Sequence, residues 1–188
     1  MGWGYRKARN ELVEAEDELR TQAERVAELR RALPLGGELA EDYEFEEPGP
    51  GNRPRKVRLS QLFGSGQQSL LIYGFMFSAD MEQPCPMCTS FLDSLNGAAP
   101  HLSQQMSVAV SARSPIDRIS EFAARRGWAN LRLLSSAHNS YQYDYLAEAD
   151  DQSQLPMANV FVQAEEELGA PEVMDLAFAF ALRKPRAP

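Results

Sequence analysis

The sequence has few residues that bind metals or form disulfides, with two cysteines and two histidines among 188 residues. Basic residues are also fewer than acidic ones: the sequence has 19 Lys and Arg and 27 Asp and Glu, which gives a net charge of −8. Phosphate contacts need a concentrated basic surface, so this balance argues against a nucleic-acid partner. The one basic cluster, residues 53–58, adjoins a stretch rich in proline and glycine, and we expect it to be a solvated loop edge.

Long apolar runs are lacking too. No stretch reaches the ~20 apolar residues needed to span a bilayer. Residues 1–7 run straight into a charged helical pattern, without the apolar segment of a signal peptide. We therefore expect a cytoplasmic protein with no membrane partner. In that compartment a Cys-x-x-Cys pair is more often catalytic, redox-sensing or metal-binding than a structural cross-link.

Residues 3–33 contain no proline and a single glycine, and their apolar residues recur at helical spacing, which predicts one long helix. A heptad seam can be written along it over four repeats. Its two rows are Tyr5, Leu12, Leu19, Val26 and Leu33, and Ala8, Ala15, Gln22 and Leu29. The second row buries little, so two alternatives stay open: a helix that lies across its own domain, or an arm that binds a partner or forms a homodimer. We divide the chain into a helical arm, residues 1–36, and one domain, residues 37–188.

Strand-like and helical segments alternate in the domain. Strands are predicted at residues 42–45, 57–63 (the end of a strand passing into a turn), 69–77, 106–110, 131–134 and 157–162. Helices are predicted from Cys85 onward and over residues 114–125, with Ser114 as N-cap and Pro115 as the first helical residue. This alternation predicts a central sheet with parallel neighbours and right-handed crossovers, flanked by helices. Residues 46–54 are predicted to form a mobile loop, and residues 173–182 are assigned to a helix.

The two cysteines form the motif Cys85-Pro86-Met87-Cys88, just after the strand-like run of residues 70–77. Cys85 is predicted to cap a helix, where unpaired backbone N–H groups stabilise a thiolate. Cys85 is then the exposed nucleophile that attacks a disulfide, and Cys88, one turn into the helix, resolves the mixed disulfide. Asp80 and Glu82 would oppose the thiolate if they turn toward it, so we expect a moderately acidic thiol. No cofactor is expected.

Metal binding is the chief chemical alternative. Cys85-x2-Cys88-x12-His101 has the front half of a zinc-finger spacing, but His138 lies 37 residues further on, where a finger would need three to five. We therefore predict no metal site. A peroxidase of the peroxiredoxin type is less favoured, because its Pro-x-x-x-Thr-x-x-Cys loop would have Ser78 and Glu82 at the first two fixed places.

A series of short motifs runs in order along residues 3–163. They are Trp3, Ala8-Arg9 and Leu12, followed by motifs within residues 42–45, 59–63, 73–77, 85–89, 92–97, 127–136 and 154–161. Together they resemble a bacterial thioredoxin-like family of unknown function, some of whose members are labelled dithiol-disulfide isomerase-like. The resemblance implies a thioredoxin-like α/β domain with the dithiol at the start of a helix.

The resemblance also implies a cis-proline at Pro156 that faces the motif, although a proline that merely enters a strand is the alternative. We expect Phe77, Pro86, Met87 and Pro156 to shape a substrate groove. The chain departs from the family after residue 161, so the last edge strand is expected to be missing or shortened.

We predict a cytoplasmic thiol-disulfide oxidoreductase that acts on a protein or small-molecule thiol or disulfide through Cys85 and Cys88. The alternative from another class is a non-enzymatic interaction protein that uses the N-terminal helix.

Overall fold

The computed structural model describes residues 3–33, 39, 41–148, 153–164 and 172–175. The chain forms two compact units, Met1–Leu35 and Gly36–Pro188. In the described part of the chain, no helix combines the length and apolar character needed to cross a membrane.

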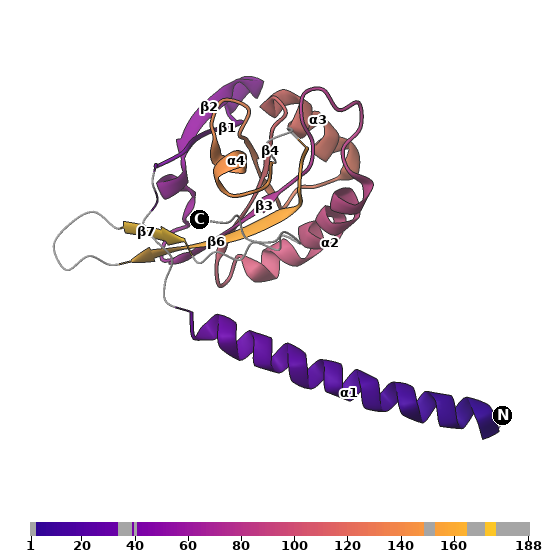
Figure 1. The fold of residues 1–188 in the computed structure, drawn as a ribbon. Helices are drawn as coiled ribbons and strands as arrows, with labels where there is room; N and C mark the ends of the chain where they lie inside the picture. Colours follow the sequence, from indigo (N-terminus) through magenta and orange to yellow (C-terminus); the bar gives the residue numbers. More distant parts are fainter. Residues whose placement is uncertain (1–2, 34–38, 40, 149–152, 165–171, 176–188) are drawn as a thin grey trace. The chain divides into compact units, whose positions relative to one another are not determined.

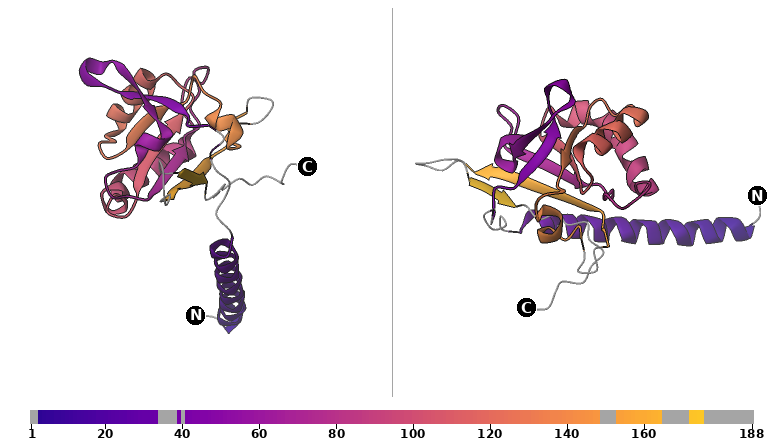
Figure 2. Two further views of the ribbon diagram at one scale, coloured as in Figure 1. Left: turned by 90° about the vertical axis from the view of Figure 1, so that its left-hand side faces the viewer. Right: turned by 90° about the horizontal axis from the view of Figure 1, so that it is seen from above.

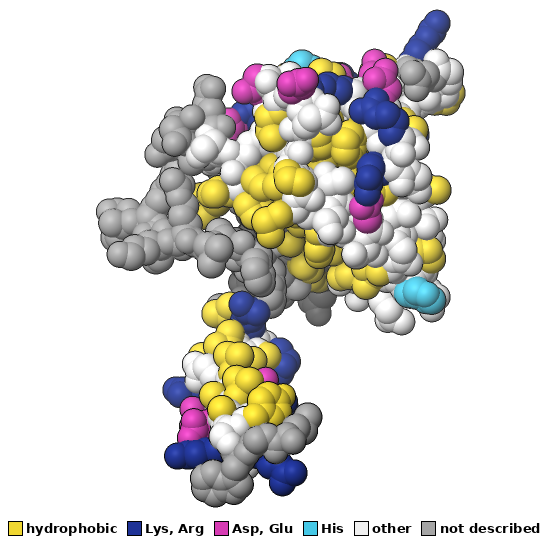
Figure 3. All heavy atoms as spheres, turned by 90° about the vertical axis from the view of Figure 1, so that its right-hand side faces the viewer, with side chains coloured by type: hydrophobic (Ala, Val, Ile, Leu, Met, Phe, Trp, Pro, Cys, Tyr) yellow, Lys and Arg dark blue, Asp and Glu magenta, His cyan; other side chains and the backbone are white. Residues whose placement is uncertain are grey.

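The first unit contains a single long helix, α1 (Trp3–Arg31), which confirms the predicted continuous helix. Arg30 and Arg31 lie in its last turn, where positive charge complements the helix dipole. Ion pairs along the helix, such as Arg9 with Glu16 at 3.0 Å and Arg20 with Asp17 at 2.9 Å, lie on its polar surface. The leucines of the predicted seam are exposed, and Leu19 reaches 70%. Figure 3 shows apolar side chains gathered along this helix, with charged side chains beside them.

The second unit is built on a sheet whose seven described strands have the order β2-β1-β5-β4-β3-β6-β7 (Figure 1). The strands are β1 (Glu44–Pro48), β2 (Pro54–Arg58), β3 (Ser69–Gly74), β4 (Ser107–Ala112), β5 (Arg132–Ser135), β6 (Met157–Ala164) and β7 (Glu172–Asp175). The central strands β3, β4 and β5 are parallel, and β1, β2, β6 and β7 pair antiparallel on the two sides. The predicted thioredoxin-like α/β sheet with parallel central strands is therefore confirmed.

Helices cover both faces of this sheet (Figure 2). They are α2 (Pro86–Leu102), α3 (Ile116–Arg126), α4 (Tyr141–Asp144) and the short 3-10 turns η1 (Pro50–Asn52) and η2 (Leu59–Leu62). Side chains of β3 alternate between the faces, as strand geometry requires: Leu71 and Tyr73 belong to the core beneath α2 and α3, and Leu70 and Ile72 to the core beneath η2 and α4. Both helical layers thus pack on side chains of β3, and the loop that follows β3 leads to the cysteine motif.

The region of residues 46–58 differs from the prediction. We expected a mobile loop and a solvated basic edge, but β1 extends to Pro48 and β2 begins at Pro54, so the two strands form a hairpin. Acidic residues of β1 face basic residues of β2, and Lys56 pairs with Glu44 at 2.6 Å. The charge of the basic cluster is therefore matched across an edge strand, which explains why proline-rich and charged sequence is compatible with a strand here.

Two element ends also differ from the prediction. Pro115, and not Ser114, is the N-cap residue of α3, because Ser114 is buried and its carbonyl oxygen accepts a hydrogen bond from the Ser135 hydroxyl at 2.7 Å. The helix assigned to residues 173–182 is wrong for residues 173–175, which belong to β7; the rest lies outside the described residues. β7 pairs with β6, so the last edge strand is not missing; the described strand has four residues, and the alternative of a shortened strand stays a prediction.

Candidate redox site

The cysteine motif lies where β3 passes through a loop into α2. Cys85 is the N-cap residue of α2 and Pro86 is its first residue, as predicted. The backbone N–H of Cys85 donates to the Met76 carbonyl at 3.1 Å, which fixes the motif to the end of β3. The Cys85 carbonyl accepts from both the backbone N–H and the hydroxyl of Thr89, at 3.0 and 2.9 Å. Both backbone groups of Cys85, its N–H and its carbonyl, are therefore hydrogen-bonded, which fixes the start of α2.

The two thiols are unequal in exposure. Both cysteines are free, Cys85 is half-buried and Cys88 is 2% exposed. The order of exposure agrees with the roles predicted for a nucleophile and a resolving thiol. The Cys85 thiol acts on the pKa of the Cys88 thiol, so the two side chains lie close together.

Burial raises the pKa of the Cys88 thiol, and its contact with Cys85 raises it further. Two groups act in the opposite direction and lower it: a hydrogen bond with the Tyr73 hydroxyl and one with the Met76 backbone. Burial of Tyr73 and its contacts with both cysteines raise the pKa of its hydroxyl. Tyr73 therefore keeps its proton at neutral pH, and its hydroxyl can donate a hydrogen bond to a Cys88 thiolate.

Arg118, in the first turn of α3, binds the loop that precedes the motif. Its guanidinium donates to four backbone carbonyl oxygens of this loop, those of Ser78, Ala79, Met81 and Glu82. The bonds to Ser78 and Ala79 are both 2.9 Å long. The same guanidinium lies 4.5 Å from the ring centroid of Phe77. One side chain thus fixes the path of the chain between β3 and Cys85.

The acidic residues of this loop are engaged elsewhere. The Ser78 hydroxyl donates to the Asp80 carboxylate, and this bond is the main reason why the pKa of Asp80 is lowered. Glu82 has an exposed side chain, and its carbonyl oxygen accepts from Arg118. The groups that act on the Cys88 thiol are Tyr73, Met76 and Cys85, and neither carboxylate is among them.

The residues predicted to shape a groove are placed differently from one another. Pro86 and Pro156 are exposed, and Met87 is 80% exposed. Phe77 is buried against the rings of Phe75 and Phe122, so it supports the loop from inside and has almost no surface to offer a substrate. That the other three residues contact a substrate stays a prediction.

The cis-proline implied by the family resemblance is wrong, since no peptide bond of the described residues is cis. Leu155 precedes Pro156 and donates its N–H to the Ala147 carbonyl at 2.8 Å. The trans form is also the ordinary preference of an X-Pro bond, by ~0.5–1 kcal/mol.

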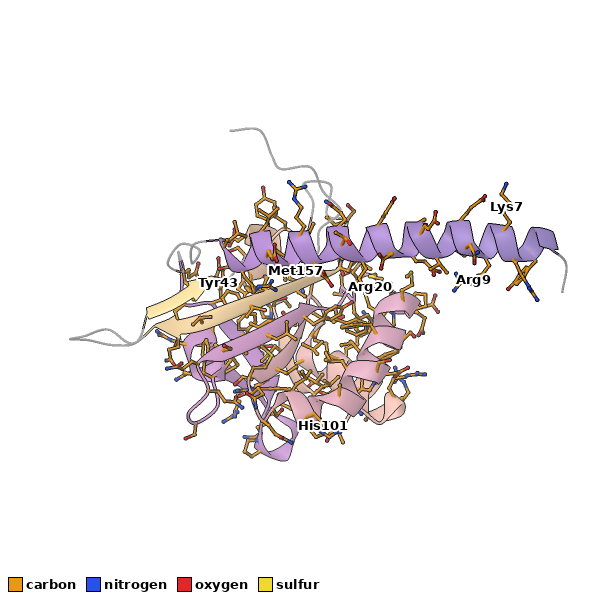
Figure 4. All side chains as sticks on the ribbon, turned by 90° about the horizontal axis from the view of Figure 1, so that it is seen from below. Lys7, Arg9, Arg20, Tyr43, His101 and Met157 are labelled. Atoms are coloured by element: carbon orange, nitrogen blue, oxygen red, sulfur yellow. The ribbon has the colours of Figure 1, made fainter. Side chains whose placement is uncertain are left out.

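The histidines of the metal alternative are not gathered at the cysteines. His101 lies in the last turn of α2, at the opposite end from Cys85 (Figure 4), and His138 follows β5. Among the described residues, no three or more His, Cys, Asp or Glu side chains lie together as metal ligands would. The described residues therefore give no support to a Cys2His2 site.

Sequence reasoning missed three residues of the site: Tyr73, Phe91 and Arg118. Phe91 is 48% exposed, and its ring centroid is 4.7 Å from that of Tyr73. Phe91 belongs to α2, and Figure 3 shows apolar side chains gathered on one face of the second unit. Arg118 could have been noticed in the sequence because it is a cation in the first turn of a predicted helix. The helix dipole disfavours positive charge there, so such a residue is expected to have another partner.

The fold and the site define a thioredoxin-like α/β protein with a Cys-x-x-Cys pair at the start of a helix. Within that class, the chain belongs to the DUF899 family of bacterial proteins of unknown function, whose model matches residues 3–174. This membership confirms the resemblance inferred from the motifs. Among curated proteins, none matches the sequence.

Solved structures of peroxiredoxins are similar in fold. Reduced Prx3 from Vibrio vulnificus in complex with hydrogen peroxide has 9% sequence identity and a TM-score of 0.54, covering 80% of this chain and 92% of that chain. A mutant of peroxiredoxin Q from Xanthomonas campestris has 14% identity and a TM-score of 0.50, covering 77% of this chain and 88% of that one. At these identities the likeness shows the fold alone.

Proposed function

We propose that the protein is a thiol-disulfide oxidoreductase in which Cys85 is the nucleophile and Cys88 the resolving thiol. The observation that carries the proposal is the pair itself: a half-buried thiol at a helix N-terminus, with a buried thiol beside it one turn into the helix. A thiol that receives a substrate must be accessible, and a thiol that only attacks its neighbour need not be.

The chemistry balances within the pair and a disulfide substrate. The Cys85 thiolate attacks one substrate sulfur, forms a mixed disulfide and releases the other sulfur as a thiolate, which takes up a proton. Cys88 then attacks the Cys85 sulfur, the intramolecular disulfide forms, and the second substrate thiol leaves with the second proton. The protein loses two electrons and the substrate gains them. A dithiol reductant regenerates the protein by the reverse exchange, which needs no cofactor.

Substrate and location are part of the proposal. The substrate is a protein or small-molecule thiol or disulfide, and exposed Pro86, Met87 and Pro156 are proposed to contact it. The cytoplasm is the proposed location, because a dithiol is the resting form of such a pair in a reducing compartment.

A redox titration tests this function directly. The full chain is equilibrated in glutathione buffers of graded potential, and free thiols are counted by mass-tagged alkylation. We expect both thiols to be lost together, at a potential between about −270 and about −120 mV. Thiols that stay reduced across this range, or that are lost singly to glutathione, would contradict the proposal.

Turnover is tested with insulin as the disulfide substrate and dithiothreitol as the dithiol reductant. Cys85→Ser should abolish the acceleration of insulin reduction, and Cys88→Ser should accumulate a mixed disulfide on Cys85. A parallel assay with hydrogen peroxide separates this activity from peroxidase chemistry. Equal insulin turnover by wild type and Cys85→Ser would sink the proposed function.

An interaction protein that acts through α1 is the second candidate, because α1 exposes large apolar side chains such as Leu19. In that case deletion of the cysteines would leave the function intact, and the redox titration would show no paired transition.

A further inference from the structure

Cys88 must act in a place that disfavours its reactive form. Its side chain is buried in the core beneath α2 and α3, and the resolving step of the proposed function requires it as a thiolate. Burial opposes the charged thiolate, as its raised pKa shows. A buried anion is tolerated only where fixed hydrogen-bond donors surround it.

Tyr73 lies in the same buried core cluster as Cys88, and its ring packs on the ring of Phe91. It is the penultimate residue of β3, is 9% exposed, and belongs to the same core cluster as Cys88. Its ring lies at 31° to the ring of Phe91, with centroids 4.7 Å apart. Phe91 follows Cys88 by three residues, so the ring that orients Tyr73 and the thiol lie on the same face of α2.

We propose that Tyr73 is a catalytic residue of the second half of the reaction, where its hydroxyl donates a hydrogen bond to the Cys88 sulfur and stabilises the thiolate that attacks Cys85. This inference rests on the proposed function. The Met76 backbone supplies a second hydrogen bond that favours the thiolate. Tyr73 acts as a donor throughout and not as a base. The Cys88 proton therefore passes to the departing substrate thiolate or to water, and the electron balance of the exchange is unchanged.

The charged surroundings of Cys88 are simple. The titratable groups that act on it are Tyr73 from β3 and Cys85 from its own helix. The residues of α3 and β4 in the same core cluster, such as Ile119 and Val110, are apolar. A change in the ionisation of Cys88 on substitution of Tyr73 is thus attributable to the hydroxyl.

The first experiment measures ionisation in a Cys85→Ser background, by the pH dependence of Cys88 alkylation with iodoacetamide. Tyr73→Phe keeps the ring and its packing on Phe91 and removes only the hydroxyl. We expect the midpoint to rise by about one pH unit, the tenfold effect of one hydrogen bond to a charged group. A midpoint that does not move would overturn the proposal.

The second experiment uses the chain with both cysteines and follows the lifetime of the mixed disulfide on Cys85 after addition of oxidised glutathione. Tyr73→Phe should lengthen this lifetime about tenfold and leave the rate of the first attack unchanged. Tyr43→Phe is the matched control, because Tyr43 is buried, donates its hydroxyl to Asp144 at 2.9 Å and packs beneath the opposite face of the sheet. It should leave the lifetime unaltered.

The outcomes distinguish failure of the redox function from failure of the role of Tyr73. If wild type forms no mixed disulfide and no intramolecular disulfide, the proposed function fails and this inference fails with it. If wild type resolves normally and Tyr73→Phe resolves as fast, only the role of Tyr73 is overturned. Should Tyr73→Phe not fold, Phe91→Leu replaces it, since loss of the ring that orients Tyr73 at a half-exposed site should lengthen the lifetime several-fold. An unchanged lifetime in that variant would equally contradict the proposal.

Discussion

Arg118 shows how much a single residue can decide about the local shape of the site. The helix dipole disfavours a cation in the first turn of a helix. Here the guanidinium donates hydrogen bonds to the carbonyl groups of a neighbouring loop. These carbonyl groups would otherwise need water or other donors. The loop between β3 and Cys85 therefore takes its conformation from a side chain that lies more than 30 residues away in sequence.

We predict that Arg118→Gln loosens this loop. A glutamine amide cannot reach four carbonyl groups, so the protein should lose about 2–4 kcal/mol of unfolding free energy, the effect of breaking several hydrogen bonds to a charged group. Amide exchange of residues 78–82 and alkylation of Cys88 should both become faster. Arg125→Gln, on the outer side of the same helix, is the control. Unchanged exchange in the loop of Arg118→Gln would show that the loop is held by other contacts.

Met87, between the two cysteines, adds no charge to the site. We predict that Met87→His makes the pair more oxidising, because a cationic imidazole near the helix N-terminus favours the thiolate of the reduced form. The titration in glutathione buffers measures the shift, with Met87→Gln as a neutral control. A potential equal to that of wild type within error would remove support for thiolate stabilisation as the factor that sets the potential.

At the scale of elements, α2 and α3 are joined outside the core by Asp93. Its carboxylate accepts from the Trp128 indole at 2.8 Å and pairs with Arg126 at the end of α3. These contacts, with Arg126 first, lower the pKa of Asp93 below its ordinary value of 3.8. A lowered pKa in the folded state means that the contribution to stability is present above pH 3.8 and is lost as pH falls through the folded value.

We therefore predict that Asp93→Asn is less stable than wild type at pH 7, and that the difference shrinks below pH 3.8 as the wild-type carboxylate becomes protonated. Urea unfolding at pH 7, 5, 4 and 3 measures both chains. Glu121→Gln, an exposed carboxylate of α3, should show no such pH dependence. A constant difference between Asp93→Asn and wild type at all four pH values would show that packing, and not charge, is responsible.

Elements with a strong local signal could be predicted from the sequence. The long α1, the cap formed by Cys85 and Pro86, and the parallel strands β3, β4 and β5 all follow from periodicity and cap chemistry. The β1–β2 hairpin could not, because residues 46–54 carry the proline and glycine of a loop and are paired through charges between the strands. β7 was missed because residues 173–175 were assigned together with the alanine-rich sequence of residues 176–182, and only pairing with β6 decides between strand and helix.

The site was predicted in part for the same reason. Cys85 and Cys88 are adjacent in sequence and share a helix, so their relation is local. Tyr73 and Arg118 reach the motif from β3 and α3, and no spacing in the sequence shows that they meet there. Phe77 was misplaced because the period of a strand does not show where the strand ends, and β3 ends at Gly74 before Phe77 turns into the core.

At the scale of the whole molecule, the chain consists of two units with opposite character. The unit built on the sheet buries its apolar residues on both faces of that sheet, and α1 carries apolar side chains that are exposed along its length. An isolated helix of this kind gains stability mainly by burying its apolar stripe. Burial of the exposed seam would therefore stabilise α1, and we propose that a second copy of α1 covers it.

We predict that the protein is a dimer joined through α1, and that Leu19→Glu together with Val26→Glu makes it monomeric. Burial of each such side chain contributes ~1.5–3 kcal/mol, and four are lost per dimer, so the dissociation constant should rise at least about ten-thousandfold. Light scattering of the eluted protein measures the mass against the 21.0 kDa of one chain. Thr21→Glu adds the same charge outside the seam and should leave the dimer intact. Because the cysteine pair belongs to the other unit, the redox titration of the double variant should match that of wild type. A wild-type chain that elutes as a monomer at all concentrations would rule out the dimer and leave α1 as a helix whose partner is another surface.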